Sequence, residues 1–303
     1  MTELSAGWGF AANTFIRGTA GEVEEMLALG AVAEDAGFDS VWVGDHVLWH
    51  TPIVDGLTLL SSYAGNTKRI KLGTAILLLG LRQPAAAMRS LTSLNALSDG
   101  RLLLGVGVGG ENPEEFEICG VPLNERGRRL DAALQMLAGQ WAEHPDRPVF
   151  EPTGPQIPVI VGGRSDAARR RVIKFGDAWL HAFVSARRVA EETSRLNQET
   201  DRRPMPALHV YVRTGDSAPS AQAAASDFLA TVYAMDGSPL MRYTVVGEPA
   251  QCAEQLATYV DAGVEHFVLR PAAWEQRAQL DDWAEHLLPL LPALGATART
   301  PAD

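Results

Sequence analysis

Short apolar runs alternate along the chain with longer amphipathic segments. The apolar runs predict strands at residues 7–10, 40–44, 70–77, 102–107, 159–162, 178–183, 207–213 and 265–269. The amphipathic segments predict helices at residues 21–36, 55–65, 84–97, 124–141, 165–175, 186–198 and 220–235, another before the last strand, and a closing helix at 274–291. This alternation is typical of repeated strand–helix–strand units and therefore of a parallel sheet.

Eight strands separated by helices favour a closed (β/α)8 TIM barrel over an open doubly wound sheet, which usually stops at about seven strands. Gly37, Pro84, Asn124 and Ser165 stand where a helix is expected to end or begin. The length of 303 residues fits one α/β domain over residues 1–295, followed by a tail at 296–303 that we expect to be disordered. The Pro-rich stretch at 144–158 predicts a surface connection.

Composition narrows the classes of partner. The net charge of −11 argues against a nucleic acid, because neutralising phosphates needs a basic surface. Cys119 and Cys252 are far apart and lack metal-ligand spacing, so we expect no metal site and a reducing, cytoplasmic environment. The N-terminal residues lack the features of a signal peptide, and no apolar run is long enough to predict a membrane span.

In a barrel of this kind, chemistry is concentrated just after the strands, at their carboxyl ends. The second predicted strand is followed by Asp45, His46 and Trp49. His46 is a candidate general acid or base because an imidazole titrates near neutrality, and Asp45 could orient it. The alternative is an aspartate that caps a helix beside a half-buried histidine with a backbone partner.

The third and fourth strands carry small residues. A Gly-Thr-Ala step containing Thr74 and Ala75 indicates either a bulge that approaches a ligand or a layer of small side chains inside the barrel. The glycine-rich run after the fourth strand includes Gly107, Val108 and Gly109, and it stands too late in the chain for a Rossmann motif. Glu111 follows this run and is either a second acid/base candidate or a solvated carboxylate in an acidic loop.

The fifth strand runs directly into a helix through a Gly-Gly turn. Its residues are Gly162, Gly163, Arg164 and Ser165. Free backbone N–H groups, the positive end of the helix and the arginine together predict an anion site, for which a cofactor phosphate is the natural ligand. The alternative is an ordinary turn capped by Ser165. Arg270 closes the last strand and is a further candidate for a phosphate or a carboxylate; the alternative is an ion pair with one of the many surface acids.

Five segments, in this order, resemble the bacterial luciferase-like monooxygenase family, which includes F420-dependent reductases and dehydrogenases. They read AEDAGFDSVWVGDHV, TKRIKLGTAILLLGLRQP, LSDGRLLLGVGVGGENPEEFEICGVPLNERGRRLDAAL, VIVGGRSDAARRRVIKFGDAWL and GEPAQCAEQLATYVDAGVEHFVL. The resemblance implies a flavin- or F420-dependent oxidoreductase that acts on a small organic substrate by hydride transfer or by monooxygenation. The Asp-His pair favours coenzyme F420 over FMN, and dimers in this family make a homodimer a further expectation.

The resemblance also implies roles for particular residues. Asp45 and His46 would lie beside the cofactor ring, with His46 as proton donor or hydride-transfer partner. Gly107, Val108 and Gly109 would line the ring, Glu111 would lie near it, and residues 162–165 would hold the phosphate. A non-proline cis peptide is expected between Thr74 and Ala75.

Two departures from the family pattern leave other functions open. The segment at 142–158 is short where the family has a longer insertion, which keeps a catalytically weak or inactive cofactor-binding barrel as an alternative. Gly110 stands at the closest gapless match to an acidic residue of the sugar-phosphate dehydrogenases, so the role of Glu111 is open. A hydrolase that uses Glu111 and Glu265 as paired carboxylates is a weaker hypothesis, because it gives the Gly-Gly-Arg-Ser turn no role.

Overall fold

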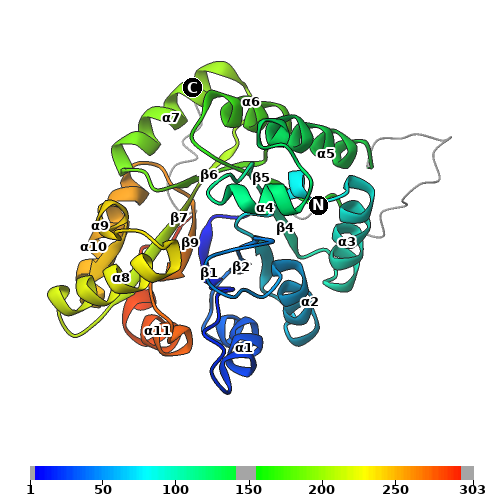
Figure 1. Cartoon of the computed structure of the whole chain (residues 1–303). Helices are drawn as coiled ribbons and strands as arrows, with labels where there is room; N and C mark the ends of the chain where they lie inside the picture. Colours follow the sequence, from blue (N-terminus) through cyan, green and yellow to red (C-terminus); the bar gives the residue numbers. More distant parts are fainter. Residues whose placement is uncertain (1–3, 141–154, 295–303) are drawn as a thin grey trace.

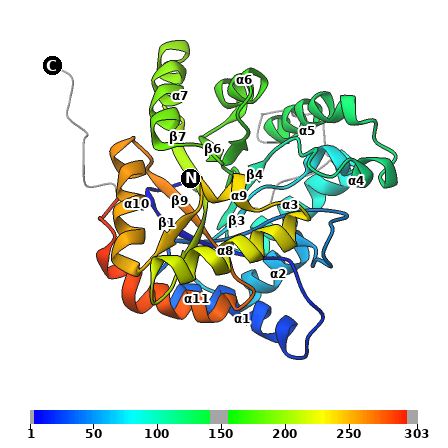
Figure 2. The same ribbon diagram turned by 60° about the vertical axis from the view of Figure 1, so that its left-hand side comes forward.

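The computed structural model describes residues 4–140 and 155–294. In that part of the chain, eight parallel strands close into a barrel surrounded by helices (Figures 1 and 2). The barrel strands are β1 (Gly7–Ala12), β2 (Ser40–Val43), β3 (Lys71–Thr74), β4 (Leu102–Val106), β5 (Val159–Gly162), β6 (Ala178–Ala182), β7 (Met205–Thr214) and β9 (His266–Pro271). Each strand pairs with the next in this order, and β9 pairs back onto β1. The predicted single-domain (β/α)8 fold is therefore confirmed.

Helices lie outside the barrel and cover its outer face (Figure 1). They are α1 (Glu22–Asp35), α2 (Gly56–Asn66), α3 (Pro84–Leu97), α4 (Pro113–Ile118), α5 (Arg126–Gln140), α6 (Asp166–Phe175), α7 (Ala186–Glu199), α8 (Ala218–Tyr233), α9 (Ser238–Met241), α10 (Pro249–Asp261) and α11 (Gln276–Asp282). Three of the four expected capping residues are in place: Gly37 follows α1 at φ 88°, Pro84 opens α3, and the Ser165 hydroxyl accepts from Ala168 N at the start of α6.

The floor of the barrel is filled by one large side chain. Trp42 of β2 is fully buried inside the barrel, and its indole N–H donates to the Ser40 hydroxyl at 2.7 Å. A Cβ on Gly73 would lie 2.1 Å from the Trp42 ring and one on Gly9 2.5 Å from its nitrogen, so both positions must be glycine. For Gly73, the glycine of the Gly-Thr-Ala step, the structure therefore agrees with the alternative interpretation, a layer of small side chains inside the barrel. Because the floor is closed, the space for a ligand lies at the carboxyl ends of the strands.

Several expected elements differ from the structure. The short strand β8 (Val245–Gly247) was not predicted, and it pairs with the end of β7 outside the closed barrel. The acidic loop expected after β4 contains helix α4, capped by the Asn112 side chain. Asn124 is not a helix cap, because a 3-10 turn at Leu123–Glu125 precedes α5. The closing helix is not continuous: α11 is followed by a π turn at Trp283–Leu287 and a 3-10 turn at Leu288–Leu290.

The expected cis peptide is displaced by one residue. It joins Ala75 and Ile76 rather than Thr74 and Ala75. The strand was also predicted to reach residue 77, but β3 ends at Thr74, and Leu77 returns to the sheet only through a single bridge to Val106. The tail at 296–303 and most of the segment at 142–158 lie outside the described residues.

Candidate active site

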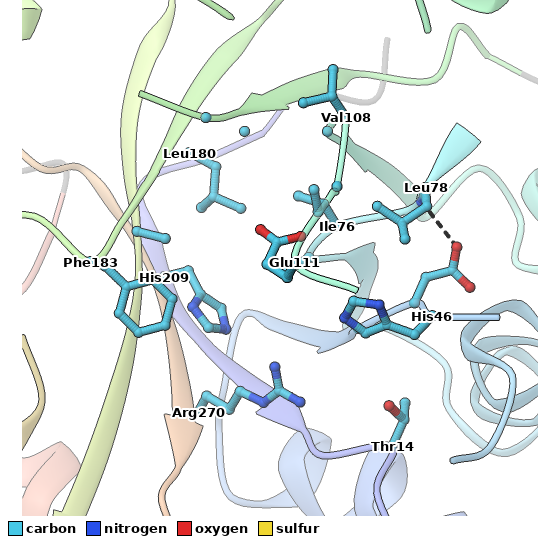
Figure 3. Close-up of a pocket in the computed structure, with 18 of the residues that line it drawn as sticks. Thr14, His46, Ile76, Leu78, Val108, Glu111, Leu180, Phe183, His209 and Arg270 are labelled. Atoms are coloured by element: carbon cyan, nitrogen blue, oxygen red, sulfur yellow. Dashed lines mark hydrogen bonds between the residues drawn. The ribbon is translucent and has the colours of Figure 1, made fainter. Parts of the chain in front are cut away.

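A cavity of about 240 Å³ opens at the carboxyl ends of the barrel strands (Figure 3). Every barrel strand, or the loop that follows it, contributes to its wall. The lining residues are Thr14, Phe15, Gly44, Asp45, His46, Trp49, Ala75, Ile76, Leu78, Gly107, Val108, Gly109, Glu111, Gly162, Gly163, Arg164, Leu180, Ala182, Phe183, His209, Tyr233 and Arg270. The structure thus brings together most of the residues that the sequence predicted, from strands far apart in the chain.

His46 is held by two neighbours that differ in chemistry. Its Nδ1 lies 3.2 Å from a carboxylate oxygen of Glu115, whose side chain is fully buried. Its ring packs on Trp49 with the centroids 4.1 Å apart, and the Trp49 indole N–H donates to Val232 O at 2.7 Å. A carboxylate oxygen accepts hydrogen bonds, so we assign the proton of this contact to Nδ1 of His46. The other nitrogen, Nε2, is therefore the one available to a ligand in the cavity.

Glu115 was missed by the sequence analysis because its segment was interpreted as a solvated loop. It stands on α4, which the Asn112 side chain ties to the loop after β2 by donating to Leu48 O at 3.0 Å. Its carboxylate also accepts from the backbone N–H of Val47 at 3.2 Å. The signal that could have identified it is Asn112-Pro113, a cap followed by a first-turn proline, which predicts a helix start.

Asp45 does not orient His46, contrary to that expectation. Its buried carboxylate accepts from Leu78 N at 3.0 Å, drawn as the dashed line in Figure 3, and from the Arg82 guanidinium at 2.6 Å. Arg82 also reaches Asp55, the cap of α2, at 3.1 Å. The nearby carboxylates raise the pKa of Arg82, although burial acts in the opposite direction as the largest single effect. Asp45 therefore fixes the turn after β3 against the turn after β2.

The β3–β4 side of the cavity is a smooth wall with little polar character. Ala75 and Ile76 line it, whereas Thr74 lies behind it, with its hydroxyl donating to Gly105 O at 2.7 Å. A Cβ on Gly107 would lie 1.9 Å from Cδ1 of Ile76, so glycine is required for Ile76 to occupy this place. Gly109 adopts φ 61°, a conformation that glycine tolerates readily. A flat ring could lie against this wall.

The anion site expected after β5 lies partly at the cavity. Gly162, Gly163 and Arg164 line it, while Ser165 lies outside the lining residues and caps α6. Arg164 donates to Phe183 O at 3.0 Å. Phe183 has φ 51°, which is uncommon for a residue other than glycine and is often found near functional sites.

A second cavity of about 360 Å³ adjoins the first and shares Arg164 and Phe183 with it. It opens at the start of α7, which is capped by the Ser185 hydroxyl. Four arginines line it, Arg164, Arg187, Arg188 and Arg242, of which Arg187 and Arg188 pair with Glu191 and Glu192. A strongly acidic protein thus presents a local basic cavity beside its barrel mouth, a place suited to an anionic group.

Glu111 and Glu265 do not form a pair of carboxylates. Glu111 lines the mouth cavity after β4. Glu265 immediately precedes β9, where its backbone pairs with Gly7 and Pro206 at the amino ends of β1 and β7. The two residues lie at opposite ends of the barrel, which excludes the hydrolase hypothesis based on this pair.

The protein is thus an eight-stranded (β/α)8 barrel with a ligand-sized cavity at the carboxyl ends of its strands. A family model for luciferase-like monooxygenases matches residues 8–241, and the chain belongs to this family. Its sequence is 25% identical to an F420-dependent glucose-6-phosphate dehydrogenase of Amycolatopsis mediterranei, in an alignment that covers 89% of this chain and 95% of that protein.

Two solved structures have the same fold. A monooxygenase from Streptomyces bottropensis is 20% identical with a TM-score of 0.79, over 93% of this chain and 99% of that one. An F420-dependent secondary alcohol dehydrogenase in complex with an F420–acetone adduct is 16% identical with a TM-score of 0.75, over 96% and 100%.

Two further observations concern the described residues alone. Residues 4–140 and 155–294 contain no cluster of three or more His, Cys, Asp or Glu side chains arranged to hold a metal ion. Within the same ranges, no helix has both the length and the apolar character needed to cross a bilayer.

Proposed function

We propose that this protein is an F420-dependent oxidoreductase that transfers a hydride to or from a small organic substrate at the mouth of the barrel. The observation that carries the proposal is the His46–Glu115 pair facing a cavity with a smooth glycine-containing wall. Membership in the luciferase-like family supports the cofactor class, and the F420-dependent relatives favour F420 over FMN.

The cavity has features that suit a flat, phosphorylated cofactor. Ala75, Ile76 and Gly107 offer a smooth surface for a ring, and Val108 and Gly109 extend it. Gly162, Gly163 and Arg164 lie on the neighbouring rim, where backbone N–H groups and a guanidinium suit a phosphate. The basic cavity beyond Arg164 offers further positive charge to an anionic end of the cofactor.

When bound, the deazaflavin ring supplies or accepts the hydride, which protein side chains cannot do. We assign the accompanying proton to His46, through its Nε2. Glu115 holds the ring in the tautomer that donates from Nδ1, so that Nε2 is presented to the cavity. Trp49 fixes the ring plane and excludes water from that side. Glu111 remains a second candidate for proton transfer, since it also lines the cavity.

Cofactor titration tests this proposal directly. Purified protein is titrated with F420 and, separately, with FMN, while absorbance and fluorescence are followed. Saturable binding of F420 with little or no binding of FMN is the expected result. Preferential binding of FMN would point instead to a monooxygenase that uses reduced flavin and oxygen, and binding of neither would contradict the proposal.

A turnover assay separates an active enzyme from a barrel that only binds the cofactor. Oxidation of reduced F420 is followed with a panel of aldehydes, ketones and enones, and reduction of F420 with a panel of alcohols and sugar phosphates. Loss of turnover in His46→Ala with retained cofactor binding supports the role of His46. Cofactor binding without turnover on any panel would favour the non-catalytic alternative.

A further inference from the structure

The β7–β9 wall of the mouth cavity carries a buried cation. Arg270, the fifth residue of β9, has only 7% of its surface exposed and lines the cavity. Its Nε donates to the Asn13 side-chain oxygen at 2.6 Å. Its guanidinium carbon lies 5.0 Å from the ring centroid of Phe15 and 5.2 Å from that of Tyr211. These contacts fix the side chain and the guanidinium plane of Arg270. They leave its two terminal nitrogens without a hydrogen bond to any described residue.

Arg270 also lacks a negatively charged partner in the described part of the chain. No carboxylate oxygen of residues 4–140 or 155–294 lies within 4.0 Å of its guanidinium nitrogens. Other shielded arginines have partners for these nitrogens: Arg169 contacts Glu199, and Arg101 donates to four backbone carbonyl oxygens and the Thr67 hydroxyl. A buried cation costs free energy unless a counter-charge compensates it. In a ligand site, the bound ligand is the natural source of that charge.

A second polar atom on the same wall has no partner. His209 of β7 is 8% exposed, and its Nε2 is buried without a hydrogen bond to any described residue. Burial, reinforced by the charge of Arg270, lowers the pKa of His209 to about 3, so the imidazole is neutral at pH 7. Figure 3 shows the Arg270 guanidinium between the rings of His209 and His46. The wall therefore offers a fixed cation next to a neutral hydrogen-bonding group.

We propose that this wall binds a carboxylate group of the substrate, which accepts from the terminal N–H groups of Arg270 and from Nε2–H of His209 in the tautomer that carries the proton there. The inference rests on the proposed function, because it anchors the substrate in the same cavity that His46 lines. The wall thus defines the substrate class as small organic acids.

A carboxylate fits this wall better than a phosphate does. One guanidinium fork matches the single charge and planar shape of a carboxylate, and the neighbouring aromatic rings of Phe15 and Tyr211 suit the apolar part of an organic acid. A doubly charged phosphate is better served by the second cavity, where four arginines meet the start of α7. The two anion sites are therefore expected to discriminate between ligands.

Thermal unfolding in the presence of propionate tests the proposal, with propionamide as the uncharged probe of nearly the same shape. The full-length protein is measured with and without bound cofactor, at constant ionic strength balanced with sodium chloride. Propionate is expected to raise the Tm in a concentration-dependent manner, because a ligand that binds only the folded state stabilises it. Propionamide is expected to give little or no shift.

Variants identify the wall as the site. Arg270→Met is expected to weaken propionate binding at least tenfold, and Arg270→Lys, which keeps the charge but not the fork, severalfold. His209→Phe is expected to weaken it less than Arg270→Met. The matched control is Arg195→Met, because Arg195 is an exposed arginine of α7 that pairs with Glu199 and Asp166. This control variant should bind propionate as tightly as the parent protein does. If Arg270→Met does not fold, Arg270→Lys and His209→Phe carry the comparison.

The outcomes separate this inference from the proposed function. Equal responses to propionate and propionamide, or undiminished propionate binding by Arg270→Lys and His209→Phe, overturn the inference even if F420 binds normally. Weaker F420 binding in Arg270→Lys, with no effect on propionate, assigns the wall to the cofactor and also overturns it. Failure of F420 to bind the parent protein contradicts the proposed function, whereas the propionate titration of the cofactor-free protein still reports on the wall.

Discussion

The carboxylate of Glu115 lies 3.2 Å from Nδ1 of His46, across 69 residues of sequence, and has no exposed side-chain surface of its own. The buried acceptor fixes both the orientation and the tautomer of an imidazole that is one-fifth exposed to the cavity. Because Glu115 touches His46 and not the cavity, its role is to position the candidate proton carrier. This relationship leads to the first prediction.

Glu115→Gln is expected to lower kcat by roughly 10²- to 10⁴-fold, because loss of the carboxylate that fixes the tautomer of a catalytic imidazole can cost about 10⁴-fold. Its amide nitrogen can face Nδ1 and favour the wrong tautomer, so the effect should appear in kcat and in the pH profile of kcat more than in KM. Glu115→Asp should recover part of the loss. The control is Glu114→Gln, an exposed neighbour on α4, which should behave as the parent. Equal losses in both variants would contradict the positioning role.

His46→Ala is expected to reduce turnover by about 10²- to 10⁴-fold, the usual contribution of a positioned acid or base. The affinity for F420 should change little, because the smooth β3–β4 wall and the rim after β5 are proposed to provide most of the cofactor contacts. Steady-state kinetics and fluorescence titration measure the two quantities separately. Unchanged turnover would transfer the role to another residue of the cavity, with Glu111 the first to test.

Arg82→Met is expected to destabilise the protein by about 3 kcal/mol or more, because it removes the cationic partner of the buried Asp45 carboxylate. Asp45 is only 4% exposed, so water cannot replace the lost guanidinium fully. Urea unfolding gives the free energy of unfolding. Asp55→Asn is the control, since it removes the more exposed contact of Arg82 while asparagine can still cap α2. A loss no larger than that of Asp55→Asn would show that the Asp45–Arg82 pair is dispensable.

Gly107→Ala is expected to weaken cofactor binding, because the added Cβ would lie 1.9 Å from Cδ1 of Ile76 and must displace that side chain, which lines the cavity. Ile76→Val removes the clashing Cδ1 and should restore much of the affinity in the double variant. Cofactor titration of the four members of this cycle measures the coupling. Additive effects of the two substitutions would contradict direct contact as the cause.

Acidification is expected to destabilise the fold between about pH 6.5 and pH 4, partly through His181. Burial, with a smaller effect from Arg188, lowers its pKa from 6.5 to about 4. Between these values the unfolded chain binds a proton that the folded chain does not, so stability falls as the pH decreases. The contribution of one such histidine is at most about 3 kcal/mol.

His181→Phe tests this pH dependence. The side chain is 1% exposed, its Nε2 has no partner among the described residues, and its ring packs on Trp179 at 4.6 Å. An apolar ring should therefore be tolerated at pH 7 and should reduce the loss of stability at pH 5. Urea unfolding at the two pH values measures the difference. The same pH dependence in parent and variant would assign the acid sensitivity to other groups, such as His209 and His266, whose pKa values are also lowered.

The sequence by itself determined the barrel and the general position of its site. Strand-and-helix periodicity is local, so runs such as residues 159–162 could be placed to the residue, and the rule that chemistry follows parallel strands selected His46, Gly107 and Arg164. Only the tertiary structure decided the pairings: Glu115 rather than Asp45 beside His46, Arg82 beside Asp45, and Arg270 near His209. The physical reason is that the pattern of polar and apolar residues in a segment predicts which of its side chains are buried. It does not predict which distant residues those side chains contact. That depends on how short connections such as α4 fold over the mouth, where no periodic pattern constrains them.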